Sequence, residues 1–282
     1  MPNMRTLLQG QLPTLEERFL TGHQASLVPI DATLGVPGLP QSATGQTTLL
    51  TGINAAEVLG YHYGPYPNGP LRQILKRESI LKRLLQNGCT VFYANAFPPI
   101  YFKRLTRGTG RSTTISLAFQ LAGVPLNGEK ELREGRALSA YLTQEHWRLF
   151  GYDLPLISPH EAGERLYRLS REYDFTIFDY FRSDICGHKG HRAEALAAIE
   201  EIDEFLGGVL ANFEPHDHLL IVTSDHGNLE DWSVRGHTHN PVPGLFVGKG
   251  HETLASRVAH LYDMAPALLG VLSLSREKTK DP

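Results

Sequence analysis

The chain has 282 residues, 41% of them hydrophobic, and a formal net charge of −3 at pH 7. This length allows one or two domains with a sizeable core, and the small negative charge disfavours a nucleic-acid-binding surface. No apolar run is long enough to span a bilayer, the N-terminus shows no secretory apolar region, and two cysteines are too few for a disulfide framework. We therefore expect a cytoplasmic protein that binds neither nucleic acid nor a membrane.

The N-terminal part predicts a short helix, a strand and a longer helix. The first 20 residues are expected to form a short amphipathic helix and a loop, and Val28 to Ala32 can form a strand. Gly and Pro residues then favour a loop, after which SATGQTTLLTG enters an apolar helix. Ser42 is expected just ahead of this helix, where its hydroxyl can either cap the N-terminus or act as a nucleophile on a phosphoryl group.

An aromatic, turn-rich loop separates this helix from the next one. It contains Tyr61, His62 and Tyr63, whose side chains can either contact a substrate or pack the loop itself. The pattern beyond it predicts a helix from Leu71 to Asn87 and then a strand from Cys89 to Tyr93.

Two candidates for substrate binding follow that strand. Asn95 lies two residues beyond it and is a candidate for the rim of a pocket. Arg107 begins a Gly-rich basic loop that precedes an apolar helix from Thr114 to Ala122. This loop lacks the Lys and the spacing of a P-loop, so a surface loop is the first interpretation and Arg111 is a candidate phosphate contact.

A predicted strand delivers the first pair of candidate metal ligands. Ser158, followed three residues later by Glu161, predicts a capping box at the start of a helix. The strand from Phe175 to Tyr180 comes next, and the segment DICGH after it places Asp184 and His188 four residues apart. In a helical turn this spacing puts both side chains on one face.

A second group of candidates lies near the C-terminal end. Leu219 to Thr223 predicts a buried parallel strand that runs into a loop with Asp225 and His226, and His237 follows. On extended backbone, adjacent side chains point to opposite sides, so the Asp-His pair suits two neighbouring metal ions. Carboxylate and imidazole together suit zinc, manganese or iron. Each residue alone also fits a surface, core or capping role.

Strands alternate with helices along the chain without internal repeats or low-complexity linkers. Clear helices are expected after residue 190 and in the C-terminal tail. The alternation predicts one α/β domain over residues 1–282, with a doubly wound, mostly parallel sheet flanked by helices.

Three motifs resemble the metal-binding core of the alkaline phosphatase superfamily. They are DICGHKG, TSDHGNLED and GHTHNPVP, in that order. They are most similar to the D-x-x-x-H, D-H-G-N and H-T-x-N-P-V-P segments of the cofactor-independent phosphoglycerate mutases and the phosphopentomutases. The resemblance is specific over the last hundred residues and weaker in the first sixty, and it implies an alkaline phosphatase-like fold.

The resemblance also indicates the nucleophile. In these enzymes the nucleophile precedes Gly by three residues, so Gly45 implies Ser42, with Thr44 as the second candidate. The His that follows this Gly in the family is Gln46 here, and Asp31 matches no ligand position. The family's first strand, which supplies a metal-binding Asp, has no counterpart, so we expect that the natural start lies upstream; loss of that ligand is the alternative.

The resemblance implies metal-dependent phosphoryl transfer from a small phosphorylated substrate, or sulfuryl transfer from a sulfated one, with two divalent ions, Mn or Zn. One ion would be held by Asp184, His188 and His237. The other would be held by Ser42, Asp225 and His226. Basic residues next to the ligands are candidates for binding substrate anions: Arg182, Lys189 and Arg235.

Several alternatives remain for the function. His191 and His239 are expected to support the ligands. Cys186 lies between two likelier ligands, so a structural role is preferred for it over that of a soft metal ligand. A phosphatase is expected before a phosphomutase, because only about 140 residues separate Ser42 from Asp184, too few for the large inserted domain of the mutases. A phosphodiesterase or sulfatase of the same superfamily and a non-catalytic metal-binding protein are the other interpretations.

Overall fold

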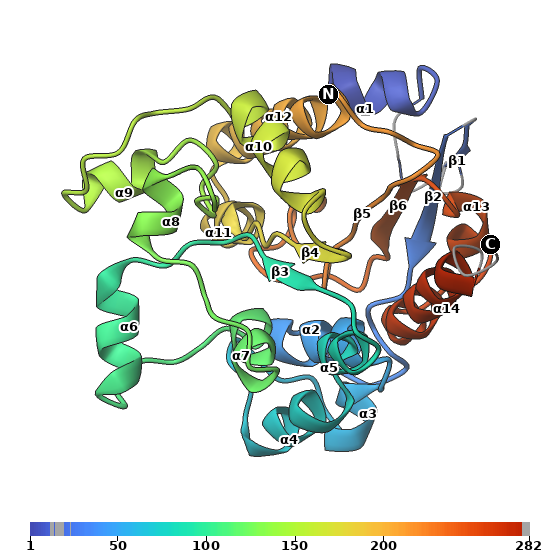
Figure 1. The fold of residues 1–282 in the computed structure, drawn as a ribbon. Coiled ribbons are helices and arrows are strands. Elements are labelled where there is room, and N and C mark those ends of the chain that lie inside the picture. Colours follow the sequence, from blue (N-terminus) through green and yellow to red (C-terminus); the bar gives the residue numbers. More distant parts are fainter. Residues whose placement is uncertain (12–13, 15–19, 23, 278–282) are drawn as a thin grey trace. The chain divides into compact units, whose positions relative to one another are not determined.

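The computed structural model describes residues 1–11, 14, 20–22 and 24–277. The chain forms two compact units, drawn together in Figure 1, and each unit is built from separate segments. The first comprises Met1–Met4, Leu85–Phe213 and Asn228–Gly236, and the second comprises Arg5–Leu84, Glu214–Gly227 and His237–Pro282. The expectation of a single domain stays a prediction. The predicted opening helix is α1 (Pro2–Leu7), while most of the loop expected after it lies outside the described residues.

A four-stranded antiparallel sheet organises the second unit. Its order is β1 (Leu20–Thr21), β2 (Ala25–Ile30), β6 (Val242–Gly248) and β5 (Leu219–Val222). The expectation that the strand from Leu219 runs parallel is wrong, since β5 pairs antiparallel with β6. The register places Leu219 opposite Gly248 and Val222 opposite Leu245, and the sequence of β5 alone does not fix the direction of its partner strand.

Helices complete the second unit. The helix α2 packs against α3, α4, α14 and the 3₁₀ turn η1, whereas α13 packs on β2 and β6. Their bounds are α2 Ser42–Thr51, α3 Ala55–Leu59, α4 Gly69–Glu78, α13 His251–Ala255, η1 Leu261–Asp263 and α14 Met264–Glu277. The single helix expected from Leu71 to Asn87 is wrong, because the extended backbone of Ser79 (ψ 140°) separates α4 from α5 (Ile80–Gln86).

The first unit is built around a short parallel pair of strands. These are β3 (Val91–Tyr93) and β4 (Phe175–Ile177), with Val91 opposite Phe175. Behind them α10 (Pro159–Ser170) and α11 (Arg182–Lys189) both pack on α12 (Arg192–Leu210). The remaining helices are α6 Pro99–Thr106, α7 Thr114–Leu121, α8 Glu129–Arg133 and α9 Glu145–Leu149.

Local signals are reproduced closely in this unit. The side chain of Ser158 accepts from the backbone N–H of Glu161, and Glu161 accepts from the backbone N–H of Ser158, as a capping box requires. The ring of Tyr93 stacks on Phe119 at a centroid distance of 4.9 Å, which joins β3 to α7.

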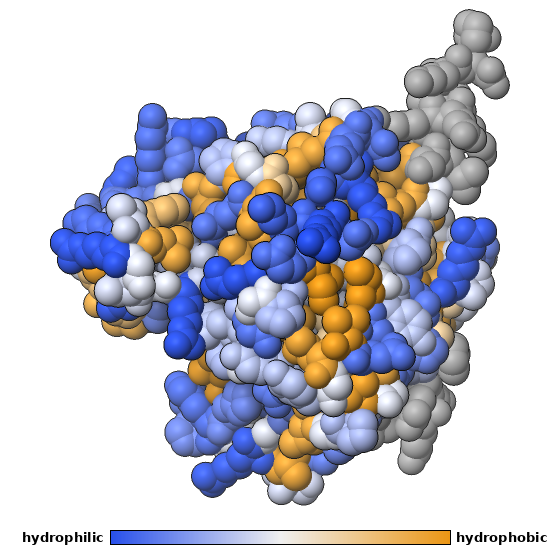
Figure 2. Space-filling model, turned by 90° about the horizontal axis from the view of Figure 1, so that it is seen from below, coloured by the Kyte–Doolittle hydropathy of each residue, from blue (hydrophilic) through white to orange (hydrophobic). Residues whose placement is uncertain are grey.

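The strands and helices together give the predicted α/β class, with parallel pairing in one sheet and antiparallel pairing in the other. Figure 2 shows a face on which hydrophobic residues reach the surface among hydrophilic ones. Among the described residues, no helix has the length and apolar character that a membrane crossing requires.

Candidate metal centre and nucleophile

Ser42 begins α2 in the second unit. The N-cap position belongs to Gln41, whose side chain makes no capping hydrogen bond, so the expectation that Ser42 lies just ahead of the helix is wrong by one residue. The Ser42 hydroxyl instead lies 3.0 Å from Nε2 of His226. Its position at the first turn of a ten-residue helix places it at the positive end of the helix dipole, which favours an anionic group, although the backbone N–H of Thr44 already donates to the carbonyl of Tyr63 at 3.0 Å.

Thr44, the second candidate for the nucleophile, is fully buried. Its hydroxyl donates to the backbone carbonyl of Gln41 at 2.9 Å and accepts from the backbone N–H of Tyr63 at 3.2 Å. These bonds tie the loop around Tyr63 to the first turn of α2. Thr44 therefore positions backbone, and Ser42 is the hydroxyl that faces the imidazole.

Asp225 and His226 follow β5 and lie against α2. The Oδ1 atom of Asp225 is 3.7 Å from Nε2 of His226, so this nitrogen has both a carboxylate oxygen and the Ser42 hydroxyl as neighbours. Gly45 makes this approach feasible, because a Cβ there would lie 2.4 Å from the backbone oxygen of Asp225. The S-x-x-G spacing thus has a packing reason within this unit.

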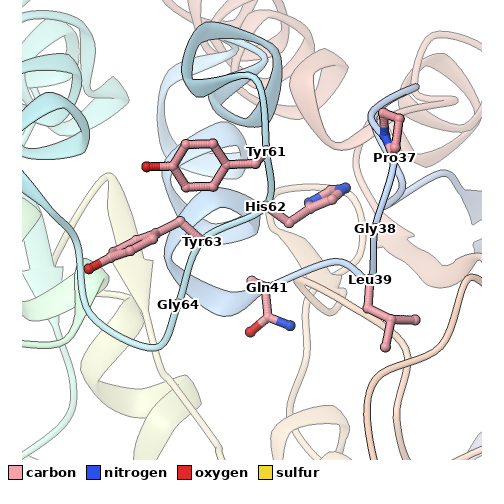
Figure 3. A pocket seen from close by; sticks show the side chains of 8 residues that line it. All are labelled: Pro37, Gly38, Leu39, Gln41, Tyr61, His62, Tyr63 and Gly64. Carbon is pink, nitrogen blue, oxygen red and sulfur yellow. The ribbon is translucent and has the colours of Figure 1, made fainter.

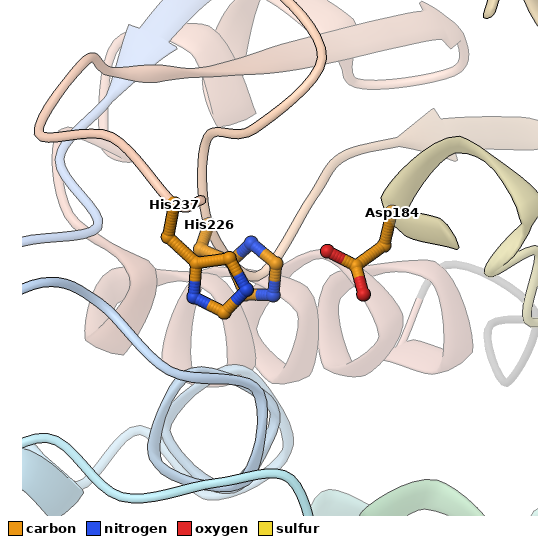
Figure 4. A group of neighbouring side chains, drawn as sticks. All are labelled: Asp184, His226 and His237. Atoms are coloured by element: carbon orange, nitrogen blue, oxygen red, sulfur yellow. The ribbon is translucent and has the colours of Figure 1, made fainter. Parts of the chain in front are cut away.

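His237 stacks on His226, with ring centroids 3.7 Å apart and an angle of 20° between the ring planes (Figure 4). Nδ1 of His237 lies 2.6 Å from the carbonyl oxygen of Pro40, and Nδ1 of His226 lies 3.4 Å from that of Gly227. A carbonyl can only accept, so each Nδ1 carries a proton, and Nε2 is the nitrogen of each neutral ring that can bind a metal ion. Metal-binding histidines characteristically donate their other ring N–H to such a group.

The loop after His237 is bound to the segment that leads into Ser42. Besides the bond from His237 to Pro40, Nε2 of His239 donates to the carbonyl of Gly38 at 3.2 Å. Alternate residues of one loop therefore hold alternate residues of the other. This arrangement is consistent with the supporting role expected for His239.

In the first unit, α11 presents Asp184 and His188 on one face. Oδ1 of Asp184 lies 3.4 Å from Nε2 of His188, as the i, i+4 spacing predicts. Oδ1 of Asp184 also accepts from Nδ2 of Asn228 at 2.6 Å. Sequence reasoning missed this contact, although Asn228 is part of the D-H-G-N motif. Gly187 leaves room for Asn228, since a Cβ there would lie 1.8 Å from its Oδ1.

Cys186 lies on the same helix, and its side chain is buried, which disfavours the thiolate form. Burial raises the pKa of its thiol, and the thiol donates to the carbonyl of Glu194 at 3.7 Å. A neutral thiol is a poor metal ligand, which is consistent with the structural role expected for it.

Two of the basic candidates in the first unit pair with acidic side chains. Arg182 forms an ion pair with Glu201, while Lys189 lies 3.3 Å from Glu194, whose Oε1 is 3.0 Å from Nδ1 of His191. These hydrogen bonds, from His191 first and Lys189 second, lower the pKa of Glu194.

The other candidates in this unit differ in exposure. Arg111 and Arg235 are exposed. Asn95 is buried, and its amide donates to the backbone carbonyl of Asp179 at 2.7 Å and accepts from the Asp179 N–H at 2.8 Å. These bonds tie the Asn95 side chain to the segment after β4, and its place at a pocket rim stays a prediction.

A cavity of about 400 Å³ lies beside the start of α2 in the second unit (Figure 3). His62 points toward the segment around Gly38, where its Nε2 donates to the carbonyl of Thr33 at 3.1 Å, whereas the rings of Tyr61 and Tyr63 point the other way. His62 thus ties its loop to the segment around Thr33, and all three aromatic residues line the cavity, so a contact with substrate stays a prediction. The lining contains no charged residue: Pro37, Gly38, Leu39, Gln41, Tyr61, His62, Tyr63 and Gly64.

Known proteins support the resemblance. Residues 155–276 match the Metalloenzyme superfamily. The 2,3-bisphosphoglycerate-independent phosphoglycerate mutase of Acetivibrio thermocellus is 37% identical over 137 residues, which cover 45% of this chain and 26% of that protein. That of Cereibacter sphaeroides is 35% identical over 158 residues, 53% of this chain and 31% of that protein. The matches thus span about a quarter to a third of these relatives' length.

Solved structures show the same fold. The PH0037 protein from Pyrococcus horikoshii aligns with a TM-score of 0.57 at 14% identity, over 96% of this chain and 88% of that one. A cold-active alkaline phosphatase from Shewanella sp. aligns with a TM-score of 0.55 at 13% identity, over 93% and 92%. The expected alkaline phosphatase-like fold is confirmed. In its C-terminal part the chain is similar to the Metalloenzyme superfamily and to a portion of the phosphoglycerate mutases.

Proposed function

We propose that this chain is a metal-dependent phosphoryl-transfer enzyme that acts on a small phosphorylated substrate in the cytoplasm, with Ser42 as the nucleophile. The observation that carries the proposal is the contact of 3.0 Å between the Ser42 hydroxyl and Nε2 of His226, at the first turn of α2 and beside Asp225. A hydroxyl and a carboxylate that both neighbour one imidazole nitrogen are a donor set that suits Zn or Mn.

The proposed ligand sets follow the motifs. Ser42, Asp225 and His226 would hold one divalent ion. Asp184, His188 and His237 would hold the other. Two supporting observations are the Nδ1–H of His237, which donates to Pro40 and so leaves Nε2 as the ligand nitrogen, and the contact between Asp184 and His188. When bound, the ions would lower the pKa of the attacking hydroxyl and neutralise charge on the phosphoryl oxygens.

The residues of the chain provide the rest of the chemistry. The Ser42 hydroxyl would lose its proton to solvent and its oxygen would attack phosphorus in line; the bond from this oxygen to phosphorus would form, the ester bond would break, and the leaving alcohol would take up a proton from water. The backbone N–H groups at the start of α2 hold the phosphoryl oxygens. Water then attacks the phosphoserine, which frees Ser42 and releases phosphate.

We propose hydrolysis rather than transfer to a second hydroxyl of the substrate. The uncharged cavity next to Gln41 fits the organic part of a neutral alcohol and offers no cation for a carboxylate such as that of a phosphoglycerate. The names of the relatives favour a mutase as the second candidate, and a phosphodiesterase or sulfatase is the third.

The test compares turnover of four substrates with added Mn²⁺ or Zn²⁺. They are p-nitrophenyl phosphate, bis(p-nitrophenyl) phosphate, p-nitrophenyl sulfate and 3-phosphoglycerate, the last assayed for 2-phosphoglycerate as well as phosphate. We expect the monoester to be hydrolysed fastest, with release of phosphate. Formation of 2-phosphoglycerate would instead support a mutase, and faster diester or sulfate cleavage would support the third candidate.

A matched pair of variants tests the nucleophile. Ser42→Ala should lower turnover at least about 1,000-fold, as expected for loss of a covalent nucleophile. The control is Ser26→Ala, because Ser26 also contacts a histidine, His251, at 2.9 Å in the same unit but is fully buried and belongs to none of the three motifs. Equal activity of both variants would contradict the assignment of Ser42.

A further inference from the structure

Gln46 lies one helical turn after Ser42 on α2, so the two side chains lie on the same face of the helix. Its Nε2 donates to Oδ2 of Asp225 at 2.9 Å, across 179 positions of sequence. A carboxylate only accepts, so the amide nitrogen must be the atom that faces it. One rigid turn of helix therefore places both the proposed nucleophile and a hydrogen-bond donor to the neighbouring carboxylate.

The two carboxylate oxygens of Asp225 have different neighbours. Oδ2 is held by the Gln46 amide, whereas Oδ1 lies 3.7 Å from Nε2 of His226, the nitrogen that also contacts Ser42. An amide N–H cannot bind a cation, so it leaves Oδ1 as the oxygen presented beside the imidazole and the hydroxyl. Holding that rotamer before a cation arrives removes part of the entropy cost of binding it.

We propose that Gln46 is a positioning residue that makes Asp225 present a single oxygen, Oδ1, to a divalent cation. This inference rests on the proposed function. It also explains how Gln can stand where the similar enzymes have His. The imidazole of a His at position 46 would carry an N–H donor at a reach similar to that of the Gln amide.

The test is titration of the purified full chain with Mn²⁺ alone by calorimetry. Gln46→Ala should weaken Mn²⁺ binding about 10-fold to 100-fold, the usual effect of removing a hydrogen-bond partner of a ligand. Gln46→His should restore binding to that of the original chain, because it returns a neutral donor. The control is Gln73→Ala, which removes an exposed Gln from α4 in the same unit and should leave binding unchanged.

Melting in EDTA separates positioning from a structural role. Gln46→Ala should melt at the temperature of the original chain while it binds Mn²⁺ more weakly. Unchanged Mn²⁺ affinity in Gln46→Ala, or weak binding that Gln46→His does not restore, would overturn the inference and leave the proposed function intact. Failure of the original chain to bind Mn²⁺ at all would overturn the proposed function itself.

Discussion

The helices α2 and α11 share one feature, a glycine that lets the D-H-G-N segment approach the helix, but the group that approaches differs between them. Each has a glycine three positions after its first functional residue, and each glycine makes room for part of the D-H-G-N segment. At Gly45 the neighbour is the backbone of Asp225, whereas at Gly187 it is the side chain of Asn228. The close contact at Gly45 is therefore with backbone, which cannot move alone, whereas the close contact at Gly187 is with a side chain that can rotate.

Exposure separates the two helices further. Beside α2, the side chains of His226 and Asp225 are 4% and 17% exposed, whereas those of His188 and Asp184 on α11 are 47% and 35% exposed. Buried, hydrogen-bonded side chains lose little rotamer freedom when they bind a ligand. We therefore expect the ligands beside α2 to be the preorganised set.

The largest expected effect is on turnover. His226→Ala should lower turnover of p-nitrophenyl phosphate by more than about 100-fold, since it removes both a proposed ligand and the partner of Ser42. His188→Ala should cost only about 10-fold, because its half-exposed side chain can be replaced by water and added Mn²⁺ should recover part of the loss. Equal losses in steady-state assays would remove the distinction between the two sets.

The glycines should differ in the free energy of unfolding, measured by urea denaturation. Gly45→Ala should cost about 1–3 kcal/mol, because the new Cβ meets the Asp225 backbone, which must move. Gly187→Ala should cost less, because the amide of Asn228 can rotate away, although it then loses its bond to Asp184. A larger loss at position 187 would reverse the comparison.

A smaller effect concerns the loop that leads into α2. His239→Ala should lower the free energy of unfolding by no more than about 1 kcal/mol, because its bond to the Gly38 carbonyl is exposed. His191→Ala is the matched control on the other unit, where the exposed imidazole contacts Glu194. Turnover should fall in His239→Ala alone if the loop positions Ser42, and equal turnover in both variants would contradict this.

The smallest expected effect concerns Cys186. Burial raises the pKa of its thiol above the value in the unfolded chain. Below the ordinary thiol pKa the thiol is neutral in both the folded and the unfolded chain, so it does not change the free energy of unfolding. As pH rises above that value, the unfolded chain ionises first and stability falls. We expect Cys186 to be alkylated by iodoacetamide more slowly than a free thiol at pH 8–9, as measured by peptide mass spectrometry. Alkylation at the free-thiol rate would contradict the burial argument.

Local patterns predicted well what depends on neighbouring residues. The one-face arrangement of Asp184 and His188 follows from helical periodicity alone, and the capping box at Ser158 depends on residues three apart. The Asp-His pair after β5 was predicted from its place at a strand end.

Features that depend on distant segments could not be predicted. The antiparallel pairing of β5 depends on where residues 223–241 return, and the contact between Gln46 and Asp225 joins residues 179 positions apart. Local propensity also gives no sign of which acidic side chain an exposed cation meets, as Arg182 and Glu201 illustrate.

The most direct test of the central claim is to trap the phosphorylated protein. The Mn²⁺-loaded chain would be mixed with p-nitrophenyl phosphate, quenched in acid and digested, and the modified peptide would be located by mass spectrometry. The account predicts a phosphoryl group on Ser42 and none in Ser42→Ala. A phosphoryl group on Thr44 or on another residue, or turnover that persists in Ser42→Ala, would contradict it.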